Sequence, residues 1–523
     1  MSLVGRVGRK RPRARLAMLT VYVALALGAL TTLYPFVLMV ATGLKGPTDQ
    51  NDNRLVPAYL ANMDSNDAAG KLDEGSLLSK FLADKYAGDA SQIRSTRIGR
   101  DATAAQVEAY GTFLMRLPLD SWMAGFRTAP NQVTGRLAIR YQAWLRGRYG
   151  TVEGLNEAYT EQNGAFQQVV APQEQLERRD WSPVRDRKFL EWLEFKATLP
   201  AEFRIPVRAQ RMFQEFWRTQ THNQFDQVPP EVAGAAKAFE ELALPRLRAR
   251  WDEFVSQRLP ARFAASTVES QWRSAIGAGT PLPIEATERA WVASNASLIR
   301  TEFASRNYAY VVDYVALHGR VLLNTLIFCL LAIATQLTVN PLAAYALSRF
   351  PLSSTYKLLV FLLATMAFPG EVAMIPSFLL LKDLGLLNTF AALVLPTAAS
   401  GYMIYLLKGF FDSLPRELFE AGQIDGACET KLMTKLALPL SRPVLGYMGL
   451  LAFMGAYGAF MYAFLVAQDR RVWTLMVWIY QLQGSAPKAV MMAALTIAAL
   501  PTLLVFLLAQ RVILKGIVLP DER

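Results

Sequence analysis

Long uncharged runs stand near both ends of the chain, on either side of a polar middle. Five of them contain no charged side chain: Leu16–Leu44, Val321–Ser348, Leu384–Leu407, Pro443–Gln468 and Ala489–Gln510. A sixth run, Leu358–Leu381, is interrupted only by Glu371. Each run is long enough for a bilayer core, which takes about 20 apolar residues to cross. The pattern predicts an α-helical polytopic membrane protein with six transmembrane helices.

Basic residues before the first run predict its orientation. Residues 1–15 contain no acidic residue and six basic ones, namely Arg6, Arg9, Lys10, Arg11, Arg13 and Arg15. The positive-inside rule places this end in the cytoplasm, and six crossings return the C-terminus to the same side. The first run is longer than a signal-peptide core and lacks a small-residue cleavage site. We therefore expect a multi-pass protein of the cytoplasmic (inner) membrane with both termini in the cytoplasm.

The polar middle, residues 46–316, is expected to be an extracytoplasmic (periplasmic) insert. It contains 33 Lys+Arg and 33 Asp+Glu, so the net charge of +12 lies entirely in the remaining segments. That charge marks topology, not a nucleic-acid surface. The expected domains are residues 1–45 with the first helix, the insert 46–316, and residues 317–523 with helices two to six.

Aromatic spacing predicts that the insert is mainly helical, with its own core. Eight of the ten tryptophans lie in it, and Phe189, Trp192 and Leu193 recur at helical spacing, as do Phe213, Phe216 and Trp217. Turn residues punctuate it at Pro130–Asn131, Pro229–Pro230 and Gly277–Pro283. Two cysteines and two histidines in the whole chain argue against a disulfide framework and a histidine metal site. We assign no metal ligand and no catalytic residue.

One unit of the insert, Trp144–Tyr159, predicts a helical hairpin. Gly150 is suited to close one helix, and Thr151 to cap the next with Glu153 in its first turn. The stretch also resembles a helix–turn–helix of β-galactosidase-type glycoside hydrolases, so a sugar-cleaving domain is the alternative. Glycosidases pair two carboxylates across a cleft. Glu153, Glu157 and Glu161 are spaced instead for one solvated helix face.

The loop between the fourth and fifth helices, residues 412–443, contains the most specific motif. Asp412, Ser413 and Glu417 indicate a helix start with a polar cap and an early acid. The small residue Gly426 permits a sharp turn after this helix, and Pro439 and Pro443 are expected to set the re-entry angle into the fifth helix. The motif residues are Glu420, Ala421, Gly422, Asp425, Gly426, Leu436, Leu438 and Pro439.

These residues resemble the EAA motif of ATP-binding-cassette (ABC) importer permeases, with the same spacing. Gly422 replaces the second alanine and Leu436 replaces isoleucine. The resemblance implies the type I ABC importer permease fold and a loop that couples the permease to an ATPase. It also implies a second, F-type permease, an ATPase dimer and an extracytoplasmic sugar-binding protein as partners, in addition to membrane lipid. No nucleic acid partner is expected.

No phosphate-binding loop of the form Gly-x-x-x-x-Gly-Lys-Ser/Thr occurs in the chain. We therefore expect no cofactor bound by this chain and no enzymatic activity of its own. The resemblance implies that ATP and Mg act in the partner ATPase subunits.

The flanking segments resemble the carbohydrate-uptake branch, and within it the maltose permease G-type subunits. Asn324–Leu326 and Ala344–Phe350 bound the second helix, Phe368–Gly370 and Ile375–Pro376 interrupt the third, and Leu384–Thr389 follows it. The resemblance covers residues 10–45 and 317–518 and omits the insert. The usual C-terminal tail is also absent, because the chain ends Leu519-Pro-Asp-Glu-Arg523.

Two further groups of residues are candidate contacts. Trp473, Trp478, Tyr480 and Gln481 occupy the position of a family loop that contacts the binding protein, or they form an aromatic belt at the membrane interface. Glu371, Tyr457 and Phe460 are candidates for the translocation path. The alternative for Glu371 is a place at the membrane face or in an external turn.

Three functions remain open. The first is a permease for a maltose-like or maltodextrin-like oligosaccharide, driven by partner ATPases through alternating access. The second is an importer permease for another sugar, a polyol or a polyol phosphate. The third is a membrane-tethered extracytoplasmic domain that acts on carbohydrates or serves as a receptor.

Overall fold

The computed structural model describes ten stretches of the chain. These are residues 12–63, 75–127, 135–245, 247–277, 280–314, 320–350, 353–365, 367, 369–484 and 486–516. Several predictions fall outside them, namely those on Arg6, Arg9, Lys10, Arg11, Pro130–Asn131, Phe368 and the C-terminal residues 519–523. The chain divides into two compact units, the first comprising Met1–Asn307 with Ala486–Val490 and the second Tyr308–Ser485 with Met491–Arg523.

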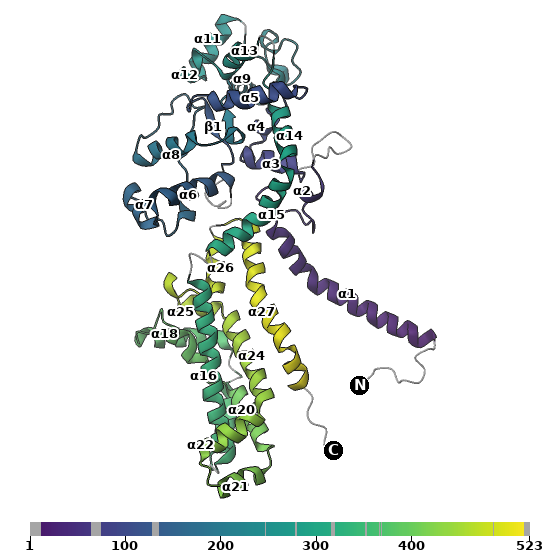
Figure 1. Ribbon diagram of the computed structural model, residues 1–523, viewed down its shortest axis with the longest axis vertical. Coiled ribbons are helices and arrows are strands. Elements are labelled where there is room, and N and C mark those ends of the chain that lie inside the picture. Colours follow the sequence, from purple (N-terminus) through teal and green to yellow (C-terminus); the bar gives the residue numbers. More distant parts are fainter. Residues whose placement is uncertain are drawn as a thin grey trace. The chain divides into compact units, whose positions relative to one another are not determined.

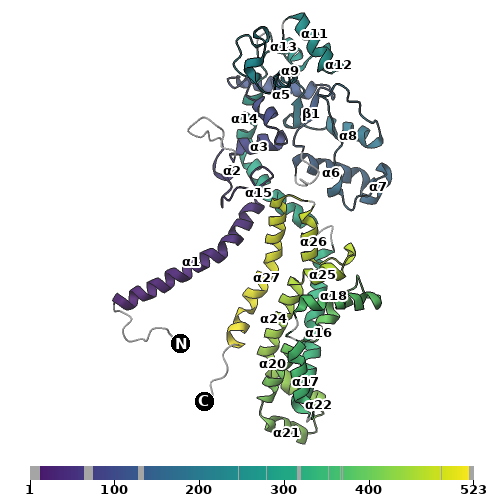
Figure 2. The same cartoon turned by 180° about the vertical axis from the view of Figure 1, so that it is seen from behind.

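The first unit is mainly helical, as predicted for the insert (Figures 1 and 2). Its longest helix, α1, spans Pro12–Gly43 and covers the first predicted transmembrane run. The other helices are α2 Ala58–Ala61, α3 Leu77–Lys85, α4 Ala90–Arg94, α5 Ala104–Arg116, α6 Arg136–Tyr149, α7 Val152–Tyr159, α8 Arg187–Ala197, α9 Ala209–Gln220, α10 Pro230–Ala233, α11 Arg248–Gln257, α12 Ala261–Ala264, α13 Val268–Ile276 and α14 Ile284–Ser294. Helix α15, Ala296–Val312, continues from this unit into the second.

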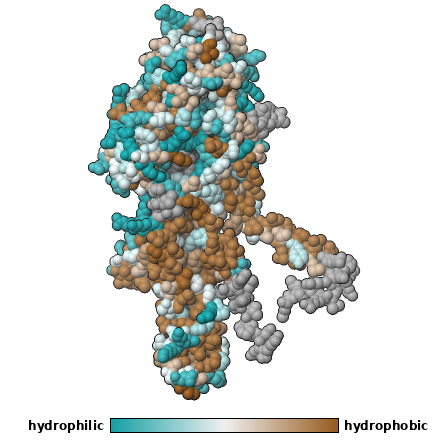
Figure 3. All heavy atoms as spheres, viewed as in Figure 1, coloured by the Kyte–Doolittle hydropathy of each residue, from teal (hydrophilic) through white to brown (hydrophobic). Residues whose placement is uncertain are grey.

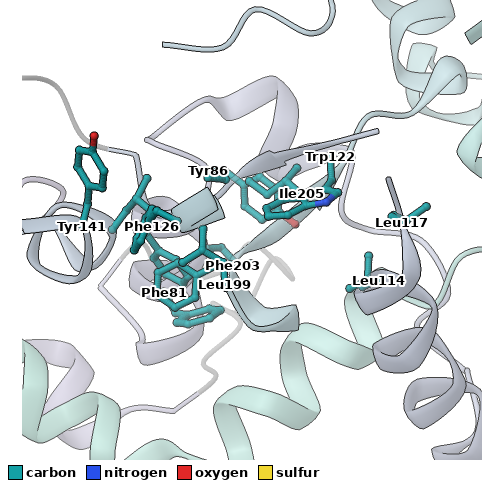
Figure 4. Close-up of a cluster of buried hydrophobic side chains, with 14 of the residues drawn as sticks. Phe81, Tyr86, Leu114, Leu117, Trp122, Phe126, Tyr141, Leu199, Phe203 and Ile205 are labelled. Carbon is teal, nitrogen blue, oxygen red and sulfur yellow. The ribbon is translucent and has the colours of Figure 1, made fainter. Parts of the chain in front are cut away.

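Two short antiparallel strands and an aromatic core organise the first unit. β1 Trp122–Ala124 pairs with β2 Arg204–Pro206, so that Trp122 lies opposite Pro206. Trp122, Trp192 and Trp272 are fully enclosed, and edge-to-face ring contacts such as Phe126 with Phe203 join the segments next to the two strands. Figure 4 shows side chains of this core around both strands.

The predicted hairpin at Trp144–Tyr159 is present as α6 and α7. Gly150 adopts a φ of +70° at the end of α6, and the Thr151 hydroxyl accepts a hydrogen bond from the Gly154 N–H at 3.3 Å. The expectation of one glutamate face is wrong for Glu161. α7 ends at Tyr159, and Glu161 lies beyond it, where Lys188 Nζ is 2.6 Å from its Oε1.

A buried ionic cluster ties the chain that follows α1 to α3, and a hydrogen bond ties the end of α1 to α15. Lys80 Nζ lies 2.5 Å from Asp49 Oδ1, and both side chains are buried. The Gly46 N–H donates to the same Asp49 oxygen at 2.6 Å, and Asn307 Nδ2 donates to the Gly43 carbonyl at 2.8 Å. Because each charge has a close partner, the cluster avoids the cost of an isolated buried ion. The Lys80–Asp49 pair therefore fixes the chain that leaves α1 against α3, and the Asn307 hydrogen bond fixes it against α15.

The second unit is built from helices that are apolar on most of their surface. Figure 3 shows predominantly hydrophobic residues over α16 and its neighbours and along α1, with hydrophilic ones concentrated on the first unit's globular part. The helices are α16 Val321–Arg349, α17 Thr355–Thr365, α18 Gly370–Asp383, α19 Phe390–Val394, α20 Gly401–Asp412, α21 Arg416–Ile424, α22 Glu429–Lys431, α23 Leu438–Leu440, α24 Arg442–Gly458, α25 Met461–Val466, α26 Leu475–Gln483 and α27 Lys488–Gly516.

Within the described residues, three helices are long and apolar enough to cross a membrane alone: Met18–Gly43, Val321–Arg349 and Lys488–Gln510. Three bent helix pairs raise the number to six if each pair forms one span. They are α17 with α18, bent by 98°, residues Phe390–Thr397 with α20, bent by 51°, and Glu429–Leu440 with α24, bent by 82°. This agrees with the predicted six-helix fold.

The predicted interruption of the third span near Pro369 is present between α17 and α18, whereas the predicted interruption at Ile375–Pro376 is wrong. Helix α17 ends at Thr365 and Pro369 immediately precedes α18, whereas Pro376 lies inside α18 without ending it. The fourth helical segment begins at Phe390 and not at Leu384, since Leu384 caps α18. The fifth breaks at Gly458, and residues Met461–Val466 form the separate helix α25.

Candidate functional site: the coupling loop and the external segment

The predicted coupling loop contains a short amphipathic helix, α21. Its first residue, Arg416, follows Pro415, and Glu417 lies in the first turn, as expected. The expected polar cap is wrong, because no side chain caps this helix. Asp412 instead ends α20, and its Oδ2 pairs with Lys408 Nζ at 2.5 Å.

Gly426 reverses the chain after α21. It adopts a φ of +75°, a conformation that strains residues with a Cβ. The Gly426 N–H donates to the Gln423 carbonyl, and the Ala427 N–H donates to the Gly422 carbonyl, both at 2.9 Å. This pair of bonds is a Schellman motif and satisfies carbonyls at the helix end. Asp425 is the capping residue just before the turn, and both Asp425 and Gly426 are exposed.

The absence of a side chain at Gly422 makes room for the next element. A Cβ at this position would lie 2.6 Å from Leu432 Cδ2. Leu432 is buried and opens a π-helix, Leu432–Ala437, that joins α22 to α23. π-helical turns are rare and often occur at functional sites. Glycine at position 422, where the motif has alanine, therefore allows α21 to pack closely against the π-helix.

A sharp turn connects the loop to α24. Leu436 and Leu438 are half-buried against the apolar cluster at this end of α16, and Pro439 is half-buried within α23. Ser441 is fully buried at the turn, and its hydroxyl donates to the Ala437 carbonyl at 2.7 Å. The segment Glu429–Leu440 meets α24 at 82°. Pro439 and Pro443 flank this turn, as expected.

Aromatic and ionic contacts hold α21 against the end of α16. Phe419 is buried beside Tyr345 and lies 3.5 Å below the Arg349 guanidinium, measured to the ring centroid. The Tyr345 hydroxyl donates to Glu429 Oε2 at 2.8 Å, and Gln423 Nε2 donates to the other oxygen of the same carboxylate at 3.2 Å. A displacement of α21 would therefore be transmitted to α16.

The opposite side of α21 is open. Glu420 and Ala421 are exposed, and the Ile424 side chain is 86% exposed, the largest value among the exposed large hydrophobic residues. Leu418 is also exposed. Such an apolar face is typical of a contact surface for another protein.

The external segment 470–483 is attached to the start of α16 by two polar side chains. Asn324 Nδ2 donates to the carbonyls of Arg471 and Trp473, at 2.9 and 3.0 Å. The Thr325 hydroxyl accepts the Leu475 N–H at 2.8 Å, where α26 begins. Both side chains are buried. In the sequence, Asn324 and Thr325 stand out only as part of a family resemblance. Their role could not be predicted, because it depends on contacts between residues about 150 positions apart.

The four candidate binding-protein residues do not share one environment. Trp478 is buried and stacks on Tyr314 with a centroid distance of 5.2 Å, while Trp473 is half-buried. Tyr480 and Gln481 are exposed. Of the four, therefore, Tyr480 and Gln481 offer the most accessible surface.

The candidate path residues are also separated. The Phe460 and Tyr480 rings lie 5.0 Å apart, whereas Tyr457 is buried and its hydroxyl donates to the Ala498 carbonyl at 2.6 Å. Glu371 is exposed in the first turn of α18. Among the described residues, no group of three or more His, Cys, Asp or Glu side chains is placed to hold a metal ion.

Comparison with known proteins identifies the second unit. Residues 339–518 match the model of the family described as "Binding-protein-dependent transport system inner membrane component". The polygalacturonan/rhamnogalacturonan transport system permease protein YtcP of Bacillus subtilis is 31% identical over 42% of this chain and 82% of that protein. The chain belongs to this family. It is an ABC importer permease, the membrane subunit of such a system and not its ATPase.

Other relatives of this permease have different names. The trehalose/maltose transport system permease protein MalG of Thermococcus litoralis is 34% identical over 42% of this chain and 81% of that protein. The sn-glycerol-3-phosphate transport system permease protein UgpE of Pectobacterium atrosepticum is 32% identical over 38% and 73%, respectively. A solved bacterial ABC transporter involved in the import of alginate is 24% identical over 39% of this chain and 78% of that chain, with a TM-score of 0.36.

Family membership fixes the general partners of the permease. A binding-protein-dependent importer combines permease subunits with an ATPase and a substrate-binding protein. The coupling loop 412–443 lies inside the matched residues 339–518, whereas the predicted insert 46–316 lies outside them.

Proposed function

We propose that this permease imports a sugar, and that its substrate is a maltose-like or maltodextrin-like oligosaccharide. Support comes from a trehalose/maltose permease and a polygalacturonan/rhamnogalacturonan permease among its relatives. The second candidate is a polyol phosphate, favoured by the sn-glycerol-3-phosphate permeases that match it at 30–32% identity. The bound ligand of the partner binding protein discriminates between these two substrates.

The observation that carries the coupling mechanism is the geometry of α21. Its exposed face at Glu420, Ala421 and Ile424 would seat against a partner ATPase, while Phe419 on the opposite side contacts α16. ATP and Mg would act in that ATPase dimer. Its closure would push α21, and the rigid turn at Ser441 would pass the motion to α24. A second, F-type permease would form the other half of the pore, and rocking of the two halves gives alternating access.

We further propose that the external segment meets the sugar-binding protein through Tyr480 and Gln481. Both side chains are exposed, and the Asn324 and Thr325 bonds hold the segment in place. Phe460, in contact with Tyr480, is the path candidate nearest to that surface. The proposal keeps the insert outside the cytoplasm and both termini in the cytoplasm.

Uptake of labelled maltose or maltodextrin by cells that express the whole importer tests the proposal. Gly426→Asp places a charged residue with a Cβ at a φ of +75° in the coupling turn. Transport should be lost, while the protein should still insert into the membrane. Gly385→Asp is the matched control, since Gly385 has a φ of +68° and open space around it in the turn after α18. Normal uptake by Gly426→Asp would count against coupling through this loop.

A further inference from the structure

The first unit contains a pocket that the transport cycle does not use. Its volume is about 290 Å³, near the lower end of the range for small-ligand sites. Five elements surround it: the end of α3, one face of α5, the 3₁₀-helix Ala201–Phe203, β2, and α14. Val107, Tyr110, Gly111 and Leu114 supply the α5 face at helical spacing. Figure 4 shows Tyr86 and Leu114 in the core from which the pocket opens.

Most of the wall is apolar, but two polar groups remain available. The Lys85 ammonium and the Tyr86 hydroxyl both bond to Glu288 Oε1, the latter at 3.2 Å. Within the part of the chain that the structure describes, no hydrogen bond engages Glu288 Oε2 or the Tyr110 hydroxyl. Both residues are more than nine-tenths buried. Burial raises the pKa of the Tyr110 hydroxyl, which is therefore protonated at neutral pH and able to donate.

The charges that line the pocket cancel. Lys85 and Arg204 are cationic, and Glu202 and Glu288 are anionic. The Arg204 guanidinium already donates four hydrogen bonds to backbone carbonyls, among them that of Leu114 at 3.0 Å. Lys85 is paired with Glu288 and the four lining charges sum to zero, so the pocket has no net charge to offset the desolvation of an anion or a cation. The balance favours a neutral ligand.

We propose that this pocket binds one ring of a neutral sugar. A sugar ring has an apolar face, which suits the wall formed by Leu114 and Trp291, and hydroxyl groups at its edge. Those hydroxyls donate to Glu288 Oε2 and accept from the Tyr110 hydroxyl. A purely apolar ligand would leave both groups unpaired in a dry site, which is unfavourable. The site is separate from the coupling loop and adds a sugar contact to the first unit.

Equilibrium dialysis of the full chain in lipid nanodiscs tests the proposal, with labelled D-glucose, D-galactose and D-mannose as probes and D-glucuronate and D-glucosamine as charged comparators. At least one neutral sugar should bind saturably and more tightly than its charged analogue. Tyr110→Phe, which removes only the hydroxyl, should weaken binding by about 3- to 10-fold, the effect of one neutral hydrogen bond.

A filling variant separates binding from folding. A Cβ on Gly111 would meet no atom within 4 Å, so Gly111→Leu fills the pocket and also favours the helix. This variant should lose sugar binding and unfold no earlier than the wild type. Gly147→Leu, in an equally open position of α6 outside the pocket, should bind normally. Absence of saturable binding by all three neutral sugars, or unchanged binding in Gly111→Leu, would overturn the site and leave the proposed import function untouched.

Discussion

At the scale of single residues, the ionic cluster at the end of α1 depends on one carboxylate, that of Asp49. Asp49 accepts hydrogen bonds from Lys80 and from the Gly46 N–H, and the Lys80 side chain is fully enclosed. Burial lowers the pKa of Lys80, while the Asp49 carboxylate acts in the opposite direction. Each of these two buried charges is therefore tolerated only while its partner is present.

Asp49→Asn should destabilise the first unit strongly. Removing one partner of a buried ion pair typically costs about 3–5 kcal/mol, because the other charge is left uncompensated. Tryptophan fluorescence during thermal unfolding reports this unit, since eight of the ten tryptophans lie in residues 46–316. Asp180→Asn removes a partner from an ion pair with Arg178 in which both side chains are well exposed, and should cost less than about 1 kcal/mol. Equal effects of the two variants would refute this account of the cluster.

Glu191 gives the first unit an acid-sensitive contact. Burial by itself would raise the pKa of this carboxyl, but hydrogen bonds from Tyr149, Tyr159 and Arg187 outweigh it and hold the pKa below the ordinary value. A carboxyl group whose pKa is lowered by folding stabilises the folded state at pH values above its ordinary pKa near 4.5. This stabilisation is lost as the pH falls through the folded-state pKa.

Glu191→Gln should therefore lower the melting temperature at pH 7, and the gap to the wild type should narrow as the pH falls below about 4.5. Melting curves recorded from pH 7 to pH 3 measure this difference in melting temperature. Glu194→Gln, at an exposed neighbouring carboxylate, should show little difference at any pH. A gap for Glu191→Gln that stays constant down to pH 3 would contradict the assignment.

At the scale of elements, hydropathy predicted where the helices lie but not how they bend. The six apolar runs all contain helices, yet hydropathy does not show the 51° break before α20 or the contact of Gly401 with α17, where a Cβ would lie 2.4 Å from the Leu362 carbonyl oxygen. Such close approach of two backbones leaves no trace in hydropathy. The π-helix at Leu432–Ala437 was likewise not predicted, since local propensity scales do not encode it.

The candidate site, too, could be predicted from the sequence only in its local features. The EAA spacing located α21 and the turn at Gly426, because both depend on residues close in sequence. The contacts of Phe419 with Tyr345, and of Tyr345 with Glu429, join residues more than 70 positions apart and appear only in the folded chain. For the same reason, the sequence did not reveal that Trp478 is buried against Tyr314.

Asn324→Ala tests whether α16 holds the external segment. The variant removes hydrogen bonds to the carbonyls of Arg471 and Trp473, and unpaired buried groups of this kind cost about 1–3 kcal/mol. Amide hydrogen exchange at residues 471–475 should therefore speed up while exchange in α20 is unchanged. Thr338→Ala, whose hydroxyl bonds only within α16, is the control. Unchanged exchange at residues 471–475 would show that other contacts fix the segment.

At the scale of the whole molecule, the chain combines a family permease with a sequence that the family model does not cover. Residues 339–518 match the family, and the predicted insert lies outside that range. The proposed coupling function concerns α21 and the loop around it, which lie within the matched residues, and the pocket beside α14 concerns the first unit alone. Separate variants can thus test the two functions independently.

The most direct test of the central claim is copurification of the partner ATPase with the full chain. Ile424→Arg places a charge on the apolar face of α21 at a side chain that is 86% exposed, so the fold should be unaffected. We predict that this variant loses the ATPase and sugar uptake together. Val184→Arg, at a side chain that is 77% exposed in the first unit, should retain both. Full ATPase retention and normal uptake by Ile424→Arg would contradict coupling through α21.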